Sequence, residues 1–190
     1  MLQWSDMVAT QNPRSPARRW TYAAYRRLPA DGLRHELIAG EHVVAPAPDV
    51  EHQAVVLQLG RRLAEQIQDA GRGVVLVAPV DLHLRPCTVV QPDVMVLLGN
   101  LDDLVGKAKI TSAPALVVEV SSPSTRYRDR GAKRRLYASA GVREYWIVDP
   151  TTRTADQFEL VEGRYVARAT GAGVLRSVAF RGVKVGLRGS

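Results

Sequence analysis

Two acidic residues and one lysine are of types that can take part in catalysis, and they stand in or near apolar segments of the chain. Asp93 follows Pro92 in an apolar run, and Glu119 lies among valines in the next apolar run. Burying a carboxylate is costly unless a cation or a hydrogen-bond network receives it. Lys133 follows on a segment with helical character. Two acids that share a divalent cation, with an ammonium group nearby, are what a metal-dependent phosphodiester hydrolase needs.

The pair Asp93 and Glu119 predicts a metal site because neighbouring strands bring such side chains close together. Two close carboxylates repel each other unless a divalent cation neutralises both. Mg²⁺ prefers one or two carboxylates, with water and substrate phosphate oxygens as its other ligands, and Mn²⁺ can substitute. Each acid alone has a structural alternative, in which Asp93 caps a turn or Glu119 pairs with an arginine. The combination with Lys133 favours the site.

Lys133 stands at four-residue spacing between Asp129 and Tyr137, so the three residues share one helix face. On that face the lysine can reach the metal site, orient the attacking water or stabilise charge on the phosphoryl group. The alternative is an ordinary Asp–Lys pair in solvent. Glu36 adds a third candidate carboxylate or is a half-exposed strand acid. His52 opens a helix and contacts the site or a phosphate, or only caps that helix.

The elements that must position these residues can be read from hydrophobic spacing and turn residues. The expected helices cover residues 21–29, 49–70 and 127–140, and a hairpin covers residues 33–48. The expected strands cover residues 74–84, 88–98, 115–122 and 144–149, followed by an antiparallel meander after Pro150. This order predicts an α/β domain with a central mixed sheet flanked by helices.

Length and composition limit the class of protein. The chain of 190 residues suits one domain, expected at residues 17–190 after a flexible lead at residues 1–16. Its single cysteine, Cys87, excludes an internal disulfide and a cysteine-rich zinc site. No apolar run is long enough to span a membrane, and the first residues lack the apolar core of a signal peptide. We therefore expect a cytoplasmic protein.

The net charge of +7 is unevenly distributed along the chain. Residues 126–135 hold six bases and one acid, directly beside the candidate lysine. Such a cluster indicates either a solvated helix face or a surface for a polyanion, and its place next to the acids favours contact with phosphates. The arginines expected to contact a DNA backbone are Arg126, Arg128, Arg130, Arg134 and Arg135.

Five segments of the chain resemble a known family. They are HELIAGE at residues 35–41, EHQ at 51–53, QPDV at 91–94, APALVVEVSSPS at 113–124 and DRGAKRRLYASAGVREYWIVDP at 129–150. In these segments the chain is similar to the Uma-type family of bacterial restriction endonucleases, formerly a domain of unknown function, in the PD-(D/E)XK nuclease superfamily. The resemblance extends over about residues 20–170, and the last segment is the most specific.

The resemblance implies the restriction-endonuclease-like fold and a Mg²⁺-dependent phosphodiesterase site. The proline–aspartate pair of the superfamily falls on Pro92 and Asp93, and its strand glutamate falls on Glu119. The usual lysine two residues after that glutamate is replaced here by Ser121. In this family the lysine is moved to the following helix, which gives Lys133. Glu36 matches the N-terminal acid of the family.

Our hypothesis from the sequence is a Mg²⁺-dependent DNA endonuclease. In it Asp93 and Glu119 hold the metal, Glu36 and His52 assist, and Lys133 orients water or stabilises the transition state. A homodimer is expected, since two sites cut two strands most easily. Two alternatives stay open: a catalytically idle nucleic-acid-binding or assembly module on the same fold, and a small-molecule phosphodiesterase.

Overall fold

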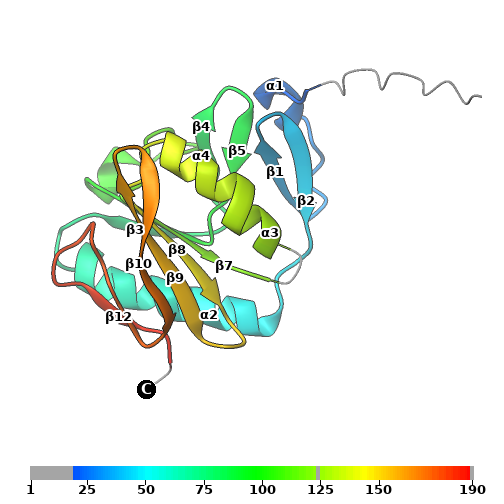
Figure 1. The fold of residues 1–190 in the computed structure, drawn as a ribbon. Helices are drawn as coiled ribbons and strands as arrows, with labels where there is room; N and C mark the ends of the chain where they lie inside the picture. The colour runs from blue at the N-terminus through cyan, green and yellow to red at the C-terminus, as the bar shows by residue number, and fades with distance from the viewer. Residues whose placement is uncertain (1–18, 123–124, 189–190) are drawn as a thin grey trace, which may run out of the picture.

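A computed structural model describes residues 19–122 and 125–188 of the chain (Figure 1). The predicted lead at residues 1–16 lies outside the described residues. The helical segments are α1 (Tyr22–Tyr25), α2 (Val50–Leu63), the π-helical η1 (Ala64–Gln68), the 3-10 segment η2 (Leu101–Asp103), α3 (Arg126–Arg128), the π-helical η3 (Asp129–Lys133) and α4 (Arg134–Ser139). Among the described helices, none is long and apolar enough to cross a membrane.

The strands form two main sheets and a small ribbon. They are β1 (Arg34–Ile38), β2 (Glu41–Ala45), β3 (Val74–Val77), β4 (Leu82–Arg85), β5 (Thr88–Val90), β6 (Val94–Leu97), β7 (Leu116–Val120), β8 (Glu144–Asp149), β9 (Thr154–Val161), β10 (Arg164–Ala172), β11 (Val174–Arg176) and β12 (Lys184–Gly186). The larger sheet has the order β10-β9-β8-β7-β6-β3, and the smaller has β2-β1-β5-β4. β11 and β12 pair with each other.

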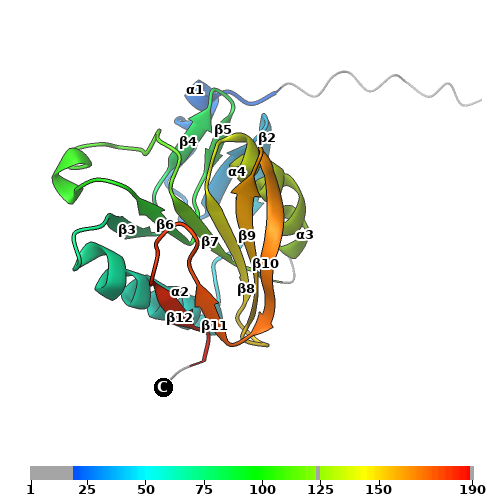
Figure 2. The same ribbon diagram turned by 60° about the vertical axis from the view of Figure 1, so that its left-hand side comes forward.

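The larger sheet is mixed, as predicted. β7 and β8 run parallel, joined by the helical segment α3–η3–α4, whereas its other neighbouring strands are antiparallel. β7 lies inside this sheet between β6 and β8, and every one of its five residues is buried. Figure 2 shows α2 and the β11–β12 ribbon on one side of the sheet and α3 and α4 on the other.

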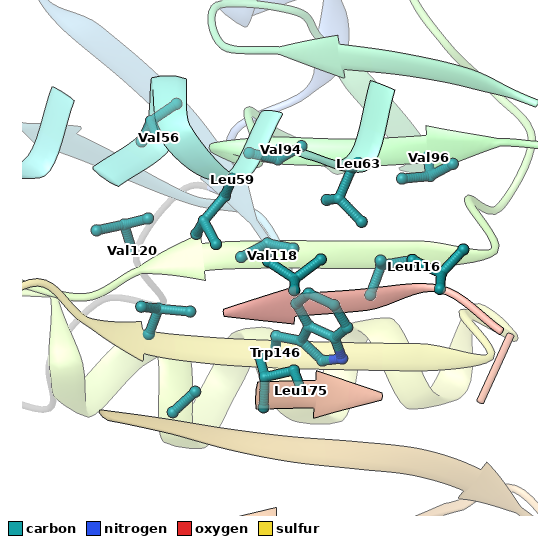
Figure 3. Packing of buried hydrophobic residues seen from close by; sticks show 14 of the residues in the cluster. Val56, Leu59, Leu63, Val94, Val96, Leu116, Val118, Val120, Trp146 and Leu175 are labelled. Carbon is teal, nitrogen blue, oxygen red and sulfur yellow. The ribbon is translucent and has the colours of Figure 1, made fainter. Parts of the chain in front are cut away.

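The face under α2 holds one apolar layer. The N-cap Asp49 accepts a hydrogen bond from the main-chain N–H of His52 at 2.8 Å, which starts the helix after the prolines before it. From there Leu59 and Leu63 point at Val118 in β7 (Figure 3). Trp146 of β8 packs into the same layer, together with residues of the β11–β12 ribbon.

The opposite face of β7 positions the polar groups. Side chains alternate along a strand, so Val118 and Val120 face α2 while Val117 and Glu119 face the other way. Val117 belongs to a second apolar cluster that includes Leu136 and Tyr137 of α4. Glu119 therefore lies beneath the helix that carries Lys133.

Several predicted elements need correction. The expected strand at residues 88–98 is two strands in different sheets, because the chain crosses from β5 to β6 at Gln91–Asp93, where Pro92 offers no N–H for pairing. The expected strand at residues 74–84 is likewise divided into β3 and β4. The expected meander after Pro150 is a hairpin, β9–β10, and a separate ribbon, β11–β12. Asp93 thus lies directly before β6 rather than in mid-strand.

The other expected elements are present, but the helix expected at residues 21–29 is a single turn, Tyr22–Tyr25. β1 and β2 form the expected hairpin, whose two turn residues Ala39 and Gly40 have φ values of 51° and 86°. Positive φ at both positions is what a tight hairpin turn of this length requires, and glycine suits it best. Thr21 caps α1, and Gly141 with φ of 84° follows the helix that ends at Ser139.

Candidate active site

The predicted acids and lysine meet in one cavity of about 220 Å³. β1, β7 and η3 each supply residues to its lining, and Asp93 comes from the position directly before β6. The residues with ionisable side chains that line it are Arg34, Glu36, Asp49, His52, Asp93, Glu119, Arg128, Asp129 and Lys133. All five residues singled out as catalytic from the sequence are among them.

Asp93 is held by donors on both carboxylate oxygens. Its Oδ1 accepts a hydrogen bond from Arg34 Nη1 at 2.7 Å, and its Oδ2 accepts one from the main-chain N–H of Val120 at 2.7 Å. His52 Nε2 lies 3.3 Å from Oδ2. Burial by itself would raise the pKa of Asp93, but the His52 hydrogen bond and the Arg34 charge outweigh it and hold the pKa at about 2. Asp93 is therefore ionised at neutral pH.

Glu119 and Glu36 both form an ion pair with Lys133. Lys133 Nζ lies 3.0 Å from Glu119 Oε1 and 3.0 Å from Glu36 Oε1, and Lys133 is only 4% exposed. The hydroxyl of Tyr137 also donates to Glu119 Oε1, at 2.6 Å. Glu119 Oε1 therefore accepts both hydrogen bonds that the described residues donate to this carboxylate. Glu36 Oε1 accepts a further hydrogen bond, from the main-chain N–H of Gln91 at 2.9 Å.

Glu119 and Lys133 both have a raised pKa, which favours the neutral form of the glutamate and the charged form of the lysine. Burial raises the pKa of Glu119 to about 8, and the Lys133 charge offsets this only in part. Burial alone would lower the pKa of Lys133, yet the surrounding carboxylates raise it, so the amine stays charged. An ordinary ion pair would lower the pKa of its acid. Here burial and the neighbouring acids outweigh the lysine, so Glu119 binds a proton more tightly than an ordinary glutamate does.

Arg34 and Asp129 also line this cavity, and neither was predicted from the sequence to be a catalytic residue. Arg34 also donates to the main-chain oxygen of Gln91, so it fixes the segment that carries Asp93. The available signal was its position two residues before Glu36 on one strand, which places both side chains on the same face. Asp129 was expected only to hold Lys133. It is 1% exposed, and its Oδ2 accepts a hydrogen bond from Ser121 Oγ at 2.8 Å.

The five arginines expected to contact DNA do not form one surface. Arg128 lines the cavity, whereas Arg126 and Arg130 pair with Asp149 and Asp156 on β8 and β9. Arg134 lies over the Phe158 ring, with 4.3 Å between its guanidinium carbon and the ring centroid. Arg135 lines a different cavity, on the side of β5. Of the five, Arg128 is the one that lines the cavity of the acids.

A divalent cation fits this donor set through two carboxylates. Four buried acids, Glu36, Asp93, Glu119 and Asp129, line the cavity together with the cations Arg34, Arg128 and Lys133. A divalent cation on Asp93 and Glu119 would take the place of the proton that the raised pKa of Glu119 favours. Within the described ranges, no group of three or more His, Cys, Asp or Glu side chains is arranged to hold a metal ion alone. Mg²⁺ does not require one, because it keeps several waters and binds substrate phosphate oxygens.

Comparisons with known proteins agree with the fold. One match among solved structures is a "putative nuclease belonging to DUF820 from Anabaena variabilis ATCC 29413". It is 15% identical, with a TM-score of 0.66, over 78% of this chain and 83% of that chain. This likeness confirms the predicted restriction-endonuclease-like fold. No curated protein matches the chain significantly.

The family model supports the resemblance noted from the sequence. The model described as "Uma2: Putative restriction endonuclease" matches residues 22–187. That span contains every residue of the cavity described above, from Arg34 to Lys133. The chain therefore belongs to the Uma2 family of putative restriction endonucleases.

Proposed function

We propose that the protein is a Mg²⁺-dependent endonuclease of the PD-(D/E)XK type that hydrolyses phosphodiester bonds in DNA. The observation that carries the proposal is the meeting of Asp93, Glu119 and Lys133 in one cavity that is open to solvent. Family membership supports the same conclusion. Mn²⁺ is expected to replace Mg²⁺, because both ions accept oxygen ligands.

Asp93 and Glu119 are the residues that would hold the ion. A bound Mg²⁺ supplies Lewis-acid polarisation of a phosphate oxygen. Arg34 keeps Asp93 ionised and turned toward the cavity, and His52 supports the same carboxylate from the start of α2. Lys133 brings a fixed positive charge between Glu36 and Glu119, where it can stabilise charge that develops on the phosphoryl group.

DNA is the proposed partner, with the five arginines of residues 126–135 as candidate backbone contacts. Arg128 at the cavity is the first of them that a phosphate in the site would meet. Contacts by Arg126 and Arg130 would require the phosphate to compete with Asp149 and Asp156. A homodimer remains part of the proposal, because two sites facing opposite strands produce a double-strand break most directly.

Cleavage of plasmid and single-stranded DNA with Mg²⁺ or Mn²⁺ tests the proposed function. We expect the purified chain to cut, and Asp93→Asn to lower the rate at least about a hundredfold because an ionised ligand is lost. Asp102→Asn, at an exposed acid in η2, is the matched control and should keep the wild-type rate. DNA binding without cutting under either ion would favour the idle module. Hydrolysis of a small phosphodiester alone would favour the third alternative.

Metal affinity should depend on pH through Glu119. Its pKa of about 8 means that a cation must displace a proton at lower pH. We expect the Mn²⁺ association constant to rise about tenfold per pH unit up to about pH 8 and then to level off, since one proton is released per ion. Calorimetry of the metal-free protein in buffers with different ionisation heats measures that proton directly. Glu119→Gln should bind Mn²⁺ weakly without this slope, and a flat wild-type profile would contradict the assignment.

A further inference from the structure

Asp129 is a buried acid of the cavity to which the proposed function assigns no role. It comes from the first residue of η3 and is 1% exposed. Its Oδ2 accepts the hydroxyl of Ser121, whereas its buried Oδ1 has no hydrogen-bond partner among the described residues. An unpartnered buried carboxylate oxygen is costly, so one that lines a cavity calls for a partner from solvent or substrate.

The other three acids are each tied to a cation. Asp93 pairs with Arg34, and Glu36 and Glu119 pair with Lys133. Within the described part of the chain, Asp129 has no ion pair within 4.0 Å, and it supplies the buried carboxylate oxygen of the cavity that lacks a donor. A carboxylate without a cation or a second donor is the stronger proton acceptor.

Lys133 cannot serve as that acceptor. Its pKa is raised by the acids around it, so its amine already carries a proton and is a donor only. Asp129, in contrast to Lys133, has a carboxylate that can accept a proton. Burial raises the pKa of Asp129, and the charge of Lys133 and the hydroxyl of Ser121 offset this only in part. A carboxylate with a raised pKa is better matched to proton transfer near neutral pH than an ordinary one.

We propose that Asp129 is the general base of the reaction, and this inference rests on the proposed nuclease function. Oδ1 accepts a proton from the attacking water as the water oxygen forms its bond to phosphorus. The bond between phosphorus and the leaving sugar oxygen then breaks, and that oxygen keeps the electron pair and takes a proton from solvent. Asp129 afterwards releases its proton to solvent, so charge and protons balance over one turnover.

Ser121 is a positioning residue in this scheme. It occupies the place two residues after Glu119 where the superfamily usually has its lysine, and it instead donates a hydrogen bond to Asp129 Oδ2. That bond leaves Oδ1 as the oxygen without a donor among the described residues. The usual single lysine is thus replaced by two residues of one helical segment, with Asp129 as proton acceptor and Lys133 as fixed charge.

The test compares Asp129→Asn with wild type in single-turnover cleavage across pH, beside Mn²⁺ calorimetry of the metal-free proteins. We expect a loss of about 10²–10⁴-fold in rate, the usual contribution of a general base. The wild-type rate should exceed the Asp129→Asn rate by a smaller factor as the pH falls, because the wild-type carboxylate becomes protonated. Mn²⁺ affinity should change by less than about threefold, since Asp129 is not assigned as a ligand.

Asp156→Asn is the matched control. Asp156 is also buried, but its Oδ2 is paired with Arg130 Nη2 at 2.5 Å, and it lines a neighbouring cavity. It should keep the wild-type rate and pH profile. If Asp129→Asn does not fold, Ser121→Ala retains the carboxylate and removes its orienting donor. It should lower the rate about tenfold and move the pH profile to higher pH, because the Ser121 hydroxyl lowers the pKa of Asp129.

Three outcomes would overturn the inference. A rate ratio that stays constant with pH would make Asp129 structural, and a large loss of Mn²⁺ affinity would make it a metal ligand. A rate for Asp129→Asn near that of wild type would remove it from the reaction. Each of these outcomes is observed only if the wild-type protein cuts DNA. Failure of the proposed function is a different result, because the wild-type protein would then not cut at all.

Discussion

Replacing Lys133 with alanine is expected to lower the cleavage rate by about 10²–10³-fold or more, the usual effect of losing one preorganised charge at a reacting group. The ammonium is held 3.0 Å from Glu36 and 3.0 Å from Glu119, and it is almost fully buried. Because the acids fix its position before substrate arrives, it requires no rearrangement during the reaction. Single-turnover cleavage at saturating DNA measures the effect without a contribution from binding.

Metal binding should survive the loss of Lys133. Glu119 already favours its protonated form, so it can relieve repulsion with Glu36 by keeping that proton until a cation displaces it. Lys133→Arg should not restore the rate, because a planar guanidinium cannot occupy the place of a compact ammonium between two acids. Lys184→Ala, at an exposed position on β12, is the control. A Lys133→Ala protein that folds and cuts at the wild-type rate would leave the lysine as a structural cation.

The largest effect on stability is expected at Glu144, far from the cavity. This fully buried carboxylate accepts five hydrogen bonds. The donors are Trp146 Nε1 at 2.6 Å, Gln157 Nε2 at 2.7 Å, Ser177 Oγ at 2.6 Å, Val178 N at 3.1 Å and Ala179 N at 2.9 Å. Together these bonds fasten the segment between β11 and β12 to the main sheet.

Glu144→Ala should lower the free energy of unfolding by about 3–5 kcal/mol, because several buried donors lose their acceptor at once. For a chain of this size that corresponds to a fall in melting temperature on the order of 10 °C. Glu159→Ala removes a half-buried acid that pairs with Arg168, and it should cost less than about 1 kcal/mol. Calorimetric melting of both variants is the measurement. Equal melting temperatures would show that water replaces the lost acceptor.

The sequence predicted the fold well where one residue pattern decided the structure. The helix at residues 49–70 follows from its cap and apolar spacing, and the central position of β7 follows from an apolar run on both faces. The family resemblance was also confirmed. The pattern failed at residues 88–98, where each half suits a strand. Only the packing of two separate sheets decides that the chain changes sheet at Pro92.

The candidate site was predictable in its acids and lysine but not in its hydrogen bonds. Asp93, Glu119 and Lys133 stood out because charged residues in apolar runs require partners. Arg34 could not be recognised as the partner of Asp93, since the two are far apart in the chain and meet only through the pairing of tertiary elements. The contrast between an ionised Asp93 and a proton-binding Glu119 also depends on donor positions that no spacing reveals.

The order in which the chain delivers its site residues has a consequence during synthesis. Arg34 and Glu36 leave the ribosome first, then Asp93 and Glu119, and Lys133 only after them. The parallel pairing of β7 with β8 requires the still later segment Glu144–Asp149. A chain that ends before β8 therefore cannot complete the sheet that carries this cavity. If the protein cuts DNA, the connectivity of the fold keeps copies that end before this strand inactive.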